Sequence, residues 1–262
     1  MAKLLQTLIP LLSFLLLAAT TARSQSTSFW YDFYGQKPTD LIYQGDAHFP
    51  SDSTFLRLTN TDSSGEPLKH RIGAAVYSKP IQFWQAGAQV DFETTVKFNI
   101  RPGSLPGDGL AFFIRPVGAA SGATGGGLGI FYSNVHTVFA VEFDTYSNPG
   151  VDPDYRHVGI DIGSNISENT TDVGSAILGR EVTARINYQK ATKEIRAVVS
   201  AGSESFEVSY VYDLSTFLPQ EVEVGISAST GGAVAIHDLV SWYFTSTMVY
   251  TSGPGGYISE VV

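Results

Sequence analysis

The sequence contains no cysteine among its 262 residues. An exported chain of this composition has no disulfides, so burial of an apolar core must hold it together. Basic residues are also scarce, with 16 Lys and Arg against 25 Asp and Glu. An acidic chain without a basic stripe is a poor partner for nucleic acid or for an anionic membrane. We therefore expect neither as a partner.

The first 24 residues have the layout of a secretory signal peptide. Residues 4–18 are almost entirely apolar and follow Lys3, and the small residues Ala22 and Ser24 precede a cleavage point before Gln25. The apolar run is shorter than the ~20 residues of a membrane span, which argues against an anchor. We therefore expect the chain to enter the secretory pathway without inserting into a membrane. Its final location would be extracellular or in a storage vacuole.

The mature chain is predicted to form one all-β domain over residues 25–250. Many short runs with period-2 alternation are separated by turn residues, and no long stretch has the 3.6-residue period of a helix. This pattern predicts a sandwich or jelly roll. Residues 251–262 lose the alternation and are expected to be flexible or trimmed. The predicted strands are Ser28–Tyr34, Leu41–Gly45, Thr54–Leu58, Gly73–Tyr77, Val90–Ile100, Gly109–Pro116, Gly126–Phe131, Val138–Tyr146, His157–Ile162, Glu181–Gln189, Glu194–Ser200, Glu204–Tyr212, Val222–Ala228 and Leu239–Met248.

The stretch Val138–Ser164 carries an unusual set of polar side chains. Glu142 and Asp144 fall on one face of an otherwise apolar strand. A polar loop follows, and His157 then opens the next strand, on the same face as Asp161. Unpaired carboxylates are costly to bury, so a solvated hairpin with incidental acids is the weaker interpretation. Carboxylates, an amide and an imidazole at this spacing favour a calcium- or manganese-type ion.

The spacing Glu142-x-Asp144-x-Tyr146-x-Asn148-x3-Asp152-x4-His157, followed by Gly-Ile-Asp-Ile-Gly-Ser164, resembles the legume lectin family. The resemblance extends over nearly the whole mature chain. It implies a jelly-roll sandwich of antiparallel sheets, with a sugar site formed by loops at one end. The implied function is non-catalytic, metal-dependent binding of glycans and glycoproteins. Weak single sites would gain from multivalency, so a homodimer or homotetramer is expected.

The same resemblance implies two ion sites that share two aspartates. Three carboxylates bring a charge of −3, and two divalent ions would hold together acids that otherwise repel one another. The implied manganese ligands are Glu142, Asp144, Asp152 and His157, with Ser167 acting through a water, and the implied calcium ligands are Asp144, the Tyr146 carbonyl, Asn148 and Asp152.

The resemblance also implies a set of sugar contacts. In the family, an aspartate that follows a cis peptide bond accepts hydrogen bonds from sugar hydroxyls, and Asp108 matches it. The residue before Asp108 is Gly107, where the family usually has alanine. The loop Ser229–His237 has the short length of mannose/glucose-binding relatives, whereas longer forms accompany galactose binding. The implied contacts are Asp108, the Gly126 N–H, the Tyr146 ring, the Asn148 amide, and the Gly232 and Ala233 N–H groups.

Two other functions stay open at this point. One is a lectin-like defence or storage protein whose sugar binding is lost or altered. The other is a jelly-roll glycoside hydrolase, which needs two carboxyl groups ~5–5.5 Å apart in a retaining enzyme. The strand Glu142-Phe-Asp144-Thr-Tyr146 has no second glutamate where such a strand would need it.

Two N-glycosylation sequons lie close together in a polar stretch. They begin at Asn165 and Asn169, and Ser167 completes the first. Because only four residues separate the two asparagines, we do not expect both to carry a glycan at once.

Overall fold

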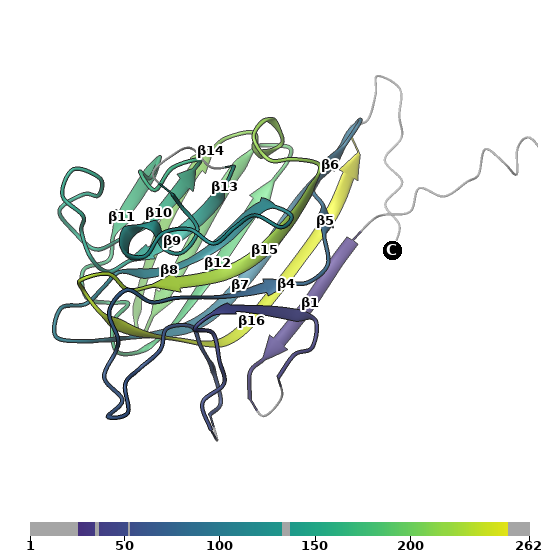
Figure 1. Cartoon of the computed structure of the whole chain (residues 1–262). Coiled ribbons are helices and arrows are strands. Elements are labelled where there is room, and N and C mark those ends of the chain that lie inside the picture. Colours follow the sequence, from purple (N-terminus) through teal and green to yellow (C-terminus); the bar gives the residue numbers. More distant parts are fainter. Residues whose placement is uncertain (1–25, 35–36, 52, 133–136, 251–262) are drawn as a thin grey trace, which may run out of the picture.

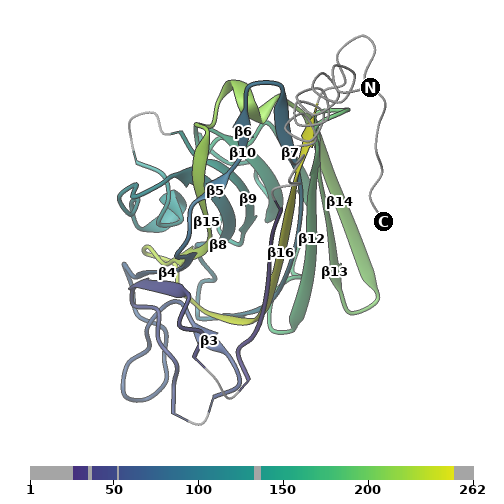
Figure 2. The same ribbon diagram turned by 90° about the vertical axis from the view of Figure 1, so that its right-hand side faces the viewer.

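The structure is a computed structural model that describes residues 26–34, 37–51, 53–132 and 137–250. Two antiparallel sheets pack face to face (Figure 1, Figure 2), which is the predicted all-β jelly-roll sandwich. The predicted signal peptide and the tail from residue 251 lie outside the described residues. Within the described part, no helix has the length and apolarity to cross a membrane.

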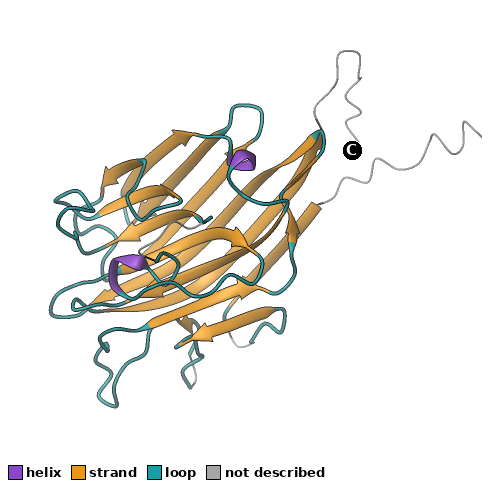
Figure 3. Cartoon of the chain, turned by 45° about the horizontal axis from the view of Figure 1, so that its top comes forward, coloured by secondary structure: helices purple, strands orange, loops and turns teal. Residues whose placement is uncertain are grey.

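Both sheets are built from strands that are distant in sequence. Sheet A runs in the order β1 (Ser26–Asp32), β16 (Ala235–Tyr250), β7 (Ala88–Pro102), β12 (Glu181–Gln189), β13 (Glu194–Ala201) and β14 (Glu204–Val211), with β3 (Leu56–Arg57) on β16 and β6 (Trp84–Gln85) on β7. Sheet B runs in the order β11 (Asn169–Asp172), β10 (His157–Ile162), β9 (Phe139–Asp144), β8 (Gly109–Pro116), β15 (Glu221–Ser229), β4 (Ile72–Tyr77) and β2 (Leu41–Gly45), with β5 (Ile81–Gln82) on β15. Two 3₁₀ turns, η1 (Gly125–Gly127) and η2 (Leu214–Thr216), are purple in Figure 3.

The main core lies between the sheets and follows from the alternation in the sequence. Along β12, Val182, Ala184, Ile186 and Tyr188 are buried while their neighbours face solvent. Large aromatic side chains from both sheets meet there, for example Phe98 and Phe143, whose ring centroids are 4.7 Å apart. Burying such a side chain contributes about 1.5–3 kcal/mol. A core of this kind agrees with a chain that has no cysteine.

Sheet B is buried on its outer face as well. Ala111, Phe113 and Ala140 point away from the main core and form a second apolar cluster with Leu128 and Phe131. The segment that follows β8 therefore folds back over the sheet instead of continuing into solvent. This packing brings the glycine-rich turn η1 to the end of the sheet.

The predicted strand Gly126–Phe131 is wrong. Its residues form η1 and a tight turn, because Gly125, Leu128 and Gly129 have positive φ angles of 71°, 48° and 70°. An extended strand excludes that backbone conformation, which glycine adopts without steric cost. Thr54–Leu58 is also too long a prediction, since only Leu56–Arg57 pairs with a neighbouring strand. The other predicted strands are confirmed to within a few residues.

His237 is a buried histidine of β16 that has no role at the loop end of sheet B. It is 0% exposed, its Nδ1 lies 2.9 Å from Thr59 Oγ1, and its Nε2 has no partner among the described residues. Burial lowers the pKa of His237 to about 3. The imidazole is therefore neutral in the folded protein.

This burial predicts a loss of stability in mild acid. Below pH 6.5 the unfolded chain protonates His237 while the folded chain does not, so each pH unit down to the folded pKa costs about 1.4 kcal/mol. Between pH 6.5 and about pH 5, wild type should lose about 2 kcal/mol more than His237→Gln, measured by urea unfolding. Parallel pH curves for the two proteins would contradict the assignment, whatever their absolute stabilities.

Candidate functional site

One row of paired residues brings four segments to the same end of sheet B. His157 in β10 pairs with Asp144 in β9, Asp144 pairs with Gly109 in β8, and Gly109 pairs with Ser229 in β15. Each of these residues begins or ends its strand. The loops that follow or precede them therefore converge, although they are far apart in the sequence.

A buried acidic cluster sits at the β9–β10 side of this row. Glu142, Asp144 and His157 are each 1% exposed, and one ligand atom from each lies within 4.8 Å of the others. His157 Nε2 is 2.9 Å from Glu142 Oε1. The structure thus assembles three of the residues that the spacing predicts as metal ligands, on the predicted face of both strands.

Asp161 and Ser167 extend this cluster inward. Ser167 Oγ is 2.7 Å from both Glu142 Oε1 and Asp161 Oδ1, and Asp161 is fully buried. The cluster fits only because Gly159 lies between His157 and Asp161. A Cβ on Gly159 would come within 2.1 Å of Ser167 Oγ and 2.8 Å of Glu142 Oε1.

The electrostatics of the cluster are unfavourable without an added cation. Burial, then the charge of Glu142, raises the pKa of Asp144 and of Asp161. Burial lowers the pKa of His157, but the hydrogen bond and charge of Glu142 outweigh it, and the net shift is upward. One imidazolium cannot neutralise several carboxylates, so the site favours any additional positive charge.

The loop between β9 and β10 adds a second group of oxygens. Asp144 Oδ1 accepts from the Tyr146 N–H at 2.7 Å, and Asp152 Oδ2 accepts from the Asn148 N–H at 2.6 Å. Burial, then the charge of Glu142, raises the pKa of Asp152 even though its bond to the Asn148 N–H lowers it. The two hydrogen bonds curl the loop so that its carboxylates face the cluster.

The amide of Asn148 can take two orientations of the same shape. With its nitrogen inward, it donates to Asp152 Oδ2 at 2.8 Å and to the Tyr146 carbonyl at 3.3 Å. With its oxygen inward, three oxygens converge, an arrangement that only a cation stabilises. The residues predicted to hold calcium are therefore collected around one point.

A hollow of about 480 Å³ opens beside this loop. Its walls include all six residues predicted to contact sugar, namely Asp108, Gly126, Tyr146, Asn148, Gly232 and Ala233. It also includes His70, Leu105 and Gly231, which the sequence did not single out. His70 and Leu105 reach the hollow only because the fold brings distant segments together, whereas Gly231 precedes Gly232 in the loop already predicted to contact sugar.

Asp108 forms the floor of this hollow. It is 3% exposed, it follows a cis peptide bond as the resemblance implies, and its Oδ2 is buried without a hydrogen-bond partner among the described residues. Its backbone is fixed on both sides, since its N–H donates to the Ser229 carbonyl at 3.0 Å and its carbonyl accepts from the Thr145 N–H at 2.8 Å. Burial is the main cause that raises the pKa of Asp108 to about 6.

The turn η1 closes another side of the hollow. A Cβ on Gly126 would lie 2.6 Å from Asn148 Oδ1, so a side chain here would displace the amide. The Gly126 carbonyl accepts from Asn165 Nδ2 at 3.1 Å. One sequon asparagine thus supports the wall of the hollow, while Asn169 is exposed and bonds to the Ser209 carbonyl at 2.8 Å. Glycosylation of either residue stays a prediction.

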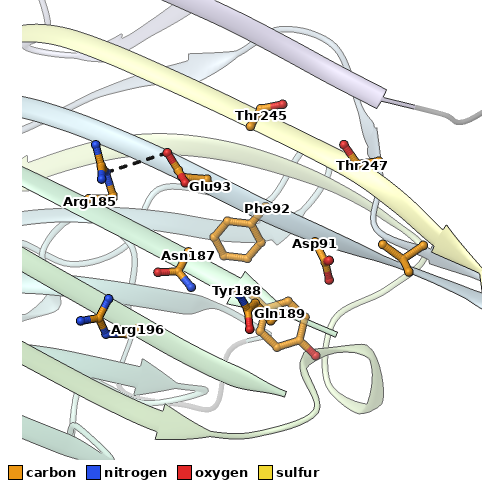
Figure 4. A pocket seen from close by; sticks show the side chains of 11 residues that line it. Asp91, Phe92, Glu93, Arg185, Asn187, Tyr188, Gln189, Arg196, Thr245 and Thr247 are labelled. Atoms are coloured by element: carbon orange, nitrogen blue, oxygen red, sulfur yellow. Dashed lines mark ion pairs between the residues drawn. The ribbon is translucent and has the colours of Figure 1, made fainter. Parts of the chain in front are cut away.

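A larger hollow of about 560 Å³ lies on the outer face of sheet A (Figure 4). Its charged groups are committed to protein partners. Arg185 pairs with Glu93 at 3.9 Å, Arg196 pairs with Glu207 at 2.6 Å, and Asp91 accepts from the Lys190 N–H at 2.7 Å. The Tyr188 hydroxyl of this hollow is buried without a hydrogen-bond partner among the described residues, but it is neutral, whereas the unpartnered oxygen of Asp108 belongs to a carboxylate. We therefore assign the candidate site to sheet B.

Comparison with known proteins adds independent evidence. The family model described as the legume lectin domain matches residues 26–254. Agglutinin-2 of Cladrastis kentukea is 39% identical over 92% of this chain and 89% of that protein. The mannose/glucose-specific lectin of Centrolobium tomentosum is 36% identical over 87% of this chain and 99% of that protein. The structure of winged bean acidic lectin complexed with methyl-α-D-galactose aligns with a TM-score of 0.80 at 33% identity, over 86% of this chain and 100% of that one.

Proposed function

The chain belongs to the legume lectin family, a family of carbohydrate-binding proteins without catalysis, and on that premise we propose that it is a secreted, metal-dependent lectin for mannose/glucose-type glycans. One observation carries the proposal. Six residues predicted from the sequence to contact sugar line a single hollow, and its floor is a buried carboxylate oxygen that has no hydrogen-bond partner in the part of the chain that the structure describes. A hydroxyl-rich ligand supplies the donors that such an oxygen needs.

The metal requirement rests on the acidic cluster next to the hollow. Glu142, Asp144, Asp152 and His157 would hold a manganese-type ion, with Ser167 beside it. Asp144, Asp152, Asn148 and the Tyr146 carbonyl would hold calcium. The donor set fits, because oxygens and one imidazole suit these ions and the carboxylates have raised pKa values. When bound, the cations supply positive charge that keeps these acids ionised and close together.

The chain's own residues then form the sugar site. An inward Asn148 oxygen leaves the amide nitrogen facing the hollow, where it can donate to a hydroxyl. Asp108 accepts from hydroxyls, and the Tyr146 ring offers an apolar face to the pyranose. The absence of a side chain on Gly126 leaves the Asn148 amide in place, because a Cβ there would lie 2.6 Å from Asn148 Oδ1.

The preference for mannose or glucose rests on the loop Ser229–His237. The N–H groups of Gly232 and Ala233 line the hollow and have no acceptor among the described residues, so both can donate to a sugar. The loop has the short length that we associate with mannose/glucose binding. The Centrolobium relative is named for that specificity, while the winged bean structure holds a galactoside, so relatives of both kinds exist.

Secretion and assembly complete the proposal. The predicted signal peptide at residues 1–24 would direct the chain to the extracellular space or a storage vacuole. A single shallow site binds weakly, and pairing of sites in a homodimer or homotetramer would raise the avidity by roughly 10²–10⁴. The partners would be glycans and glycoproteins.

A glycan array with calcium and manganese supplied tests the proposal. We expect binding to mannose- and glucose-terminated glycans and none to galactose-terminated ones. Binding confined to galactose would overturn the specificity. Absence of binding to any glycan, with the metals present and the protein folded, would favour a defence or storage protein that has lost sugar binding. Release of reducing sugar from an oligosaccharide would favour a hydrolase.

A further inference from the structure

The two N-glycosylation sequons that follow β10 place their asparagines in different surroundings. In the first sequon, Asn165 Nδ2 donates to the Gly126 carbonyl at 3.1 Å, and Ser167 Oγ donates to Glu142 Oε1 at 2.7 Å. Both side chains therefore point into the protein, while Ile166 between them is 56% exposed. The nitrogen of Asn165 that would carry a glycan is thus in contact with the turn η1.

The second sequon lies at the surface. Asn169 begins the edge strand β11 and is exposed. Its Nδ2 donates to the Ser209 carbonyl of β14 at 2.8 Å, and its Oδ1 accepts from the Thr170 N–H at 3.0 Å. Neither partner lines the hollow that contains Asp108. A glycan on Asn169 can therefore extend into solvent at the cost of one exposed hydrogen bond.

The position of η1 decides whether this hollow keeps its shape. Gly126 lines the hollow, and a Cβ on it would lie 2.6 Å from Asn148 Oδ1, so the turn and this amide are in close contact. Two side chains hold the turn: Ser229 Oγ donates to the Gly125 carbonyl at 2.6 Å, and Asn165 Nδ2 donates to that of Gly126. A displacement of η1 therefore moves the Gly126 N–H and disturbs the Asn148 amide together.

We propose that Asn165 is a positioning residue of the sugar site, and that N-glycosylation of Asn165 disables this site whereas N-glycosylation of Asn169 leaves it intact. The inference rests on the proposed function of the hollow. In the modification, Nδ2 loses a proton and bonds to C1 of an oligosaccharide, while the bond from C1 to the diphosphate of the lipid-linked donor breaks. A pyranose attached to Asn165 Nδ2 must lie against η1 and displace it. The occupancy of Asn165 would then set the fraction of secreted molecules that bind sugar.

The positioning role predicts an effect in protein without any glycan. In protein from a bacterial host, Asn165→Leu keeps the approximate shape of the side chain and removes its N–H donor. With calcium and manganese present, its affinity for methyl α-D-mannopyranoside should fall about fivefold, which corresponds to one neutral hydrogen bond. Asn169→Leu is the matched control, because it also removes one amide donor, and it should bind like wild type. Hydrogen exchange at the amides of η1 should be faster in Asn165→Leu alone, a readout that needs no sugar.

The effect of the glycan is tested with one sequon at a time. Asn169→Gln and Asn165→Gln are each produced in bacteria and in a secretory host, and an endoglycosidase trims every glycan to a single N-acetylglucosamine. The Asn169→Gln protein then carries its glycan on Asn165. Its sugar affinity should be about thirtyfold below that of its bacterial form, because the Gly126 N–H and the Asn148 amide would both lose their bonds to the sugar. The two forms of Asn165→Gln should have equal affinity, and metal content should be the same in every form.

A further variant makes the test independent of how the host modifies the chain. Asn165→Trp, made in bacteria, places a ring at the same point and should lose as much affinity as glycosylated Asn169→Gln. Equal affinity of the two forms of Asn169→Gln, or of Asn165→Trp and wild type, would overturn the silencing by a glycan. Wild-type affinity and exchange in Asn165→Leu would overturn the positioning role. Absence of sugar binding in unglycosylated wild type would overturn the proposed function and the silencing with it, and the exchange rates at η1 would still decide the positioning role.

Discussion

Removal of divalent metal by a chelator should lower the affinity for sugar by at least about a hundredfold. The reason is the position of Asn148 and Tyr146 on the loop after β9. The Tyr146 N–H bonds to Asp144 at the end of the strand, and the Asn148 N–H bonds to Asp152 within the loop. Without cations these acids repel one another and Asn148 turns its nitrogen inward, away from the ligand. Loss of a metal ligand or its support commonly costs 10–100-fold in affinity or activity, and loss of both ions should cost more.

The measurement is calorimetric sugar titration of protein before and after dialysis against chelator, followed by return of calcium and manganese. Glu142→Ala should behave like the chelated protein even with metals present, because Glu142 contacts both His157 and Ser167. Glu204→Ala is the control, because it also removes one carboxylate, but an exposed one on β14 of sheet A, and it should bind sugar like wild type. Undiminished sugar binding in fully metal-free protein would eliminate metals from the mechanism.

The raised carboxylate pKa values also predict how the stability of the protein, with and without cations, depends on pH. In metal-free protein, Asp144, Asp152 and Asp161 bind protons more tightly when folded than when unfolded. The stability that these three carboxyl groups contribute should therefore be fully present in acid and lost as the pH rises through their folded pKa values. Cations replace those protons, so their stabilising effect should be largest near neutral pH. A cation effect that grows toward acid would contradict this sign.

Asp108→Asn should abolish sugar binding while leaving metal content unchanged. The substitution keeps the shape of the side chain but turns one acceptor oxygen into a donor, which cannot accept from a hydroxyl. A hydrogen bond to a charged group is worth about 1.5–3 kcal/mol; the substitution removes one such bond and leaves only a neutral acceptor for the other, so affinity should fall about a hundredfold. Metal content measured by atomic absorption and sugar affinity measured by calorimetry separate the two effects.

The unfolding temperature of Asp108→Asn shows whether a loss of sugar binding comes from misfolding. Burial raises its pKa to about 6, so the ionised carboxylate destabilises the folded state at neutral pH. Asp108→Asn removes that charge and should unfold at an equal or higher temperature than wild type at pH 7. In wild type, sugar affinity should fall as the pH drops through about 6, because a protonated Asp108 loses an acceptor. Retained sugar binding in Asp108→Asn would invalidate this assignment.

The sequence predicted the strands and the acidic cluster because both depend on local alternation. Glu142 and Asp144 on β9, and His157 and Asp161 on β10, lie on the faces that period-2 geometry assigns to them. The family spacing then led to Asn148 and Asp152 in the intervening loop.

The turn η1 and the roles of Asp161 and Leu105 could not be predicted from the neighbouring sequence alone. The turn at Gly125–Gly127 looked like a strand because Leu128, Ile130 and Phe131 are apolar, yet these residues cover the outer face of sheet B. Asp161 carried no predicted role because only the fold shows that Ser167 returns to it. Leu105 joined the site through pairing of the distant residue Val234 with its carbonyl.

The aligned row from His157 through Asp144 and Gly109 to Ser229 has a consequence for how this site can diversify. Side chains in a strand alternate, so inserting one residue within any of these strands would turn its buried acids or its core residues to the opposite face. Residues added beyond the row lengthen only a loop. The segment 230–234 could therefore be exchanged between proteins to alter recognition while the ion-binding half stays intact. We expect loop grafts cut at the row to fold and grafts cut inside the strands to fail.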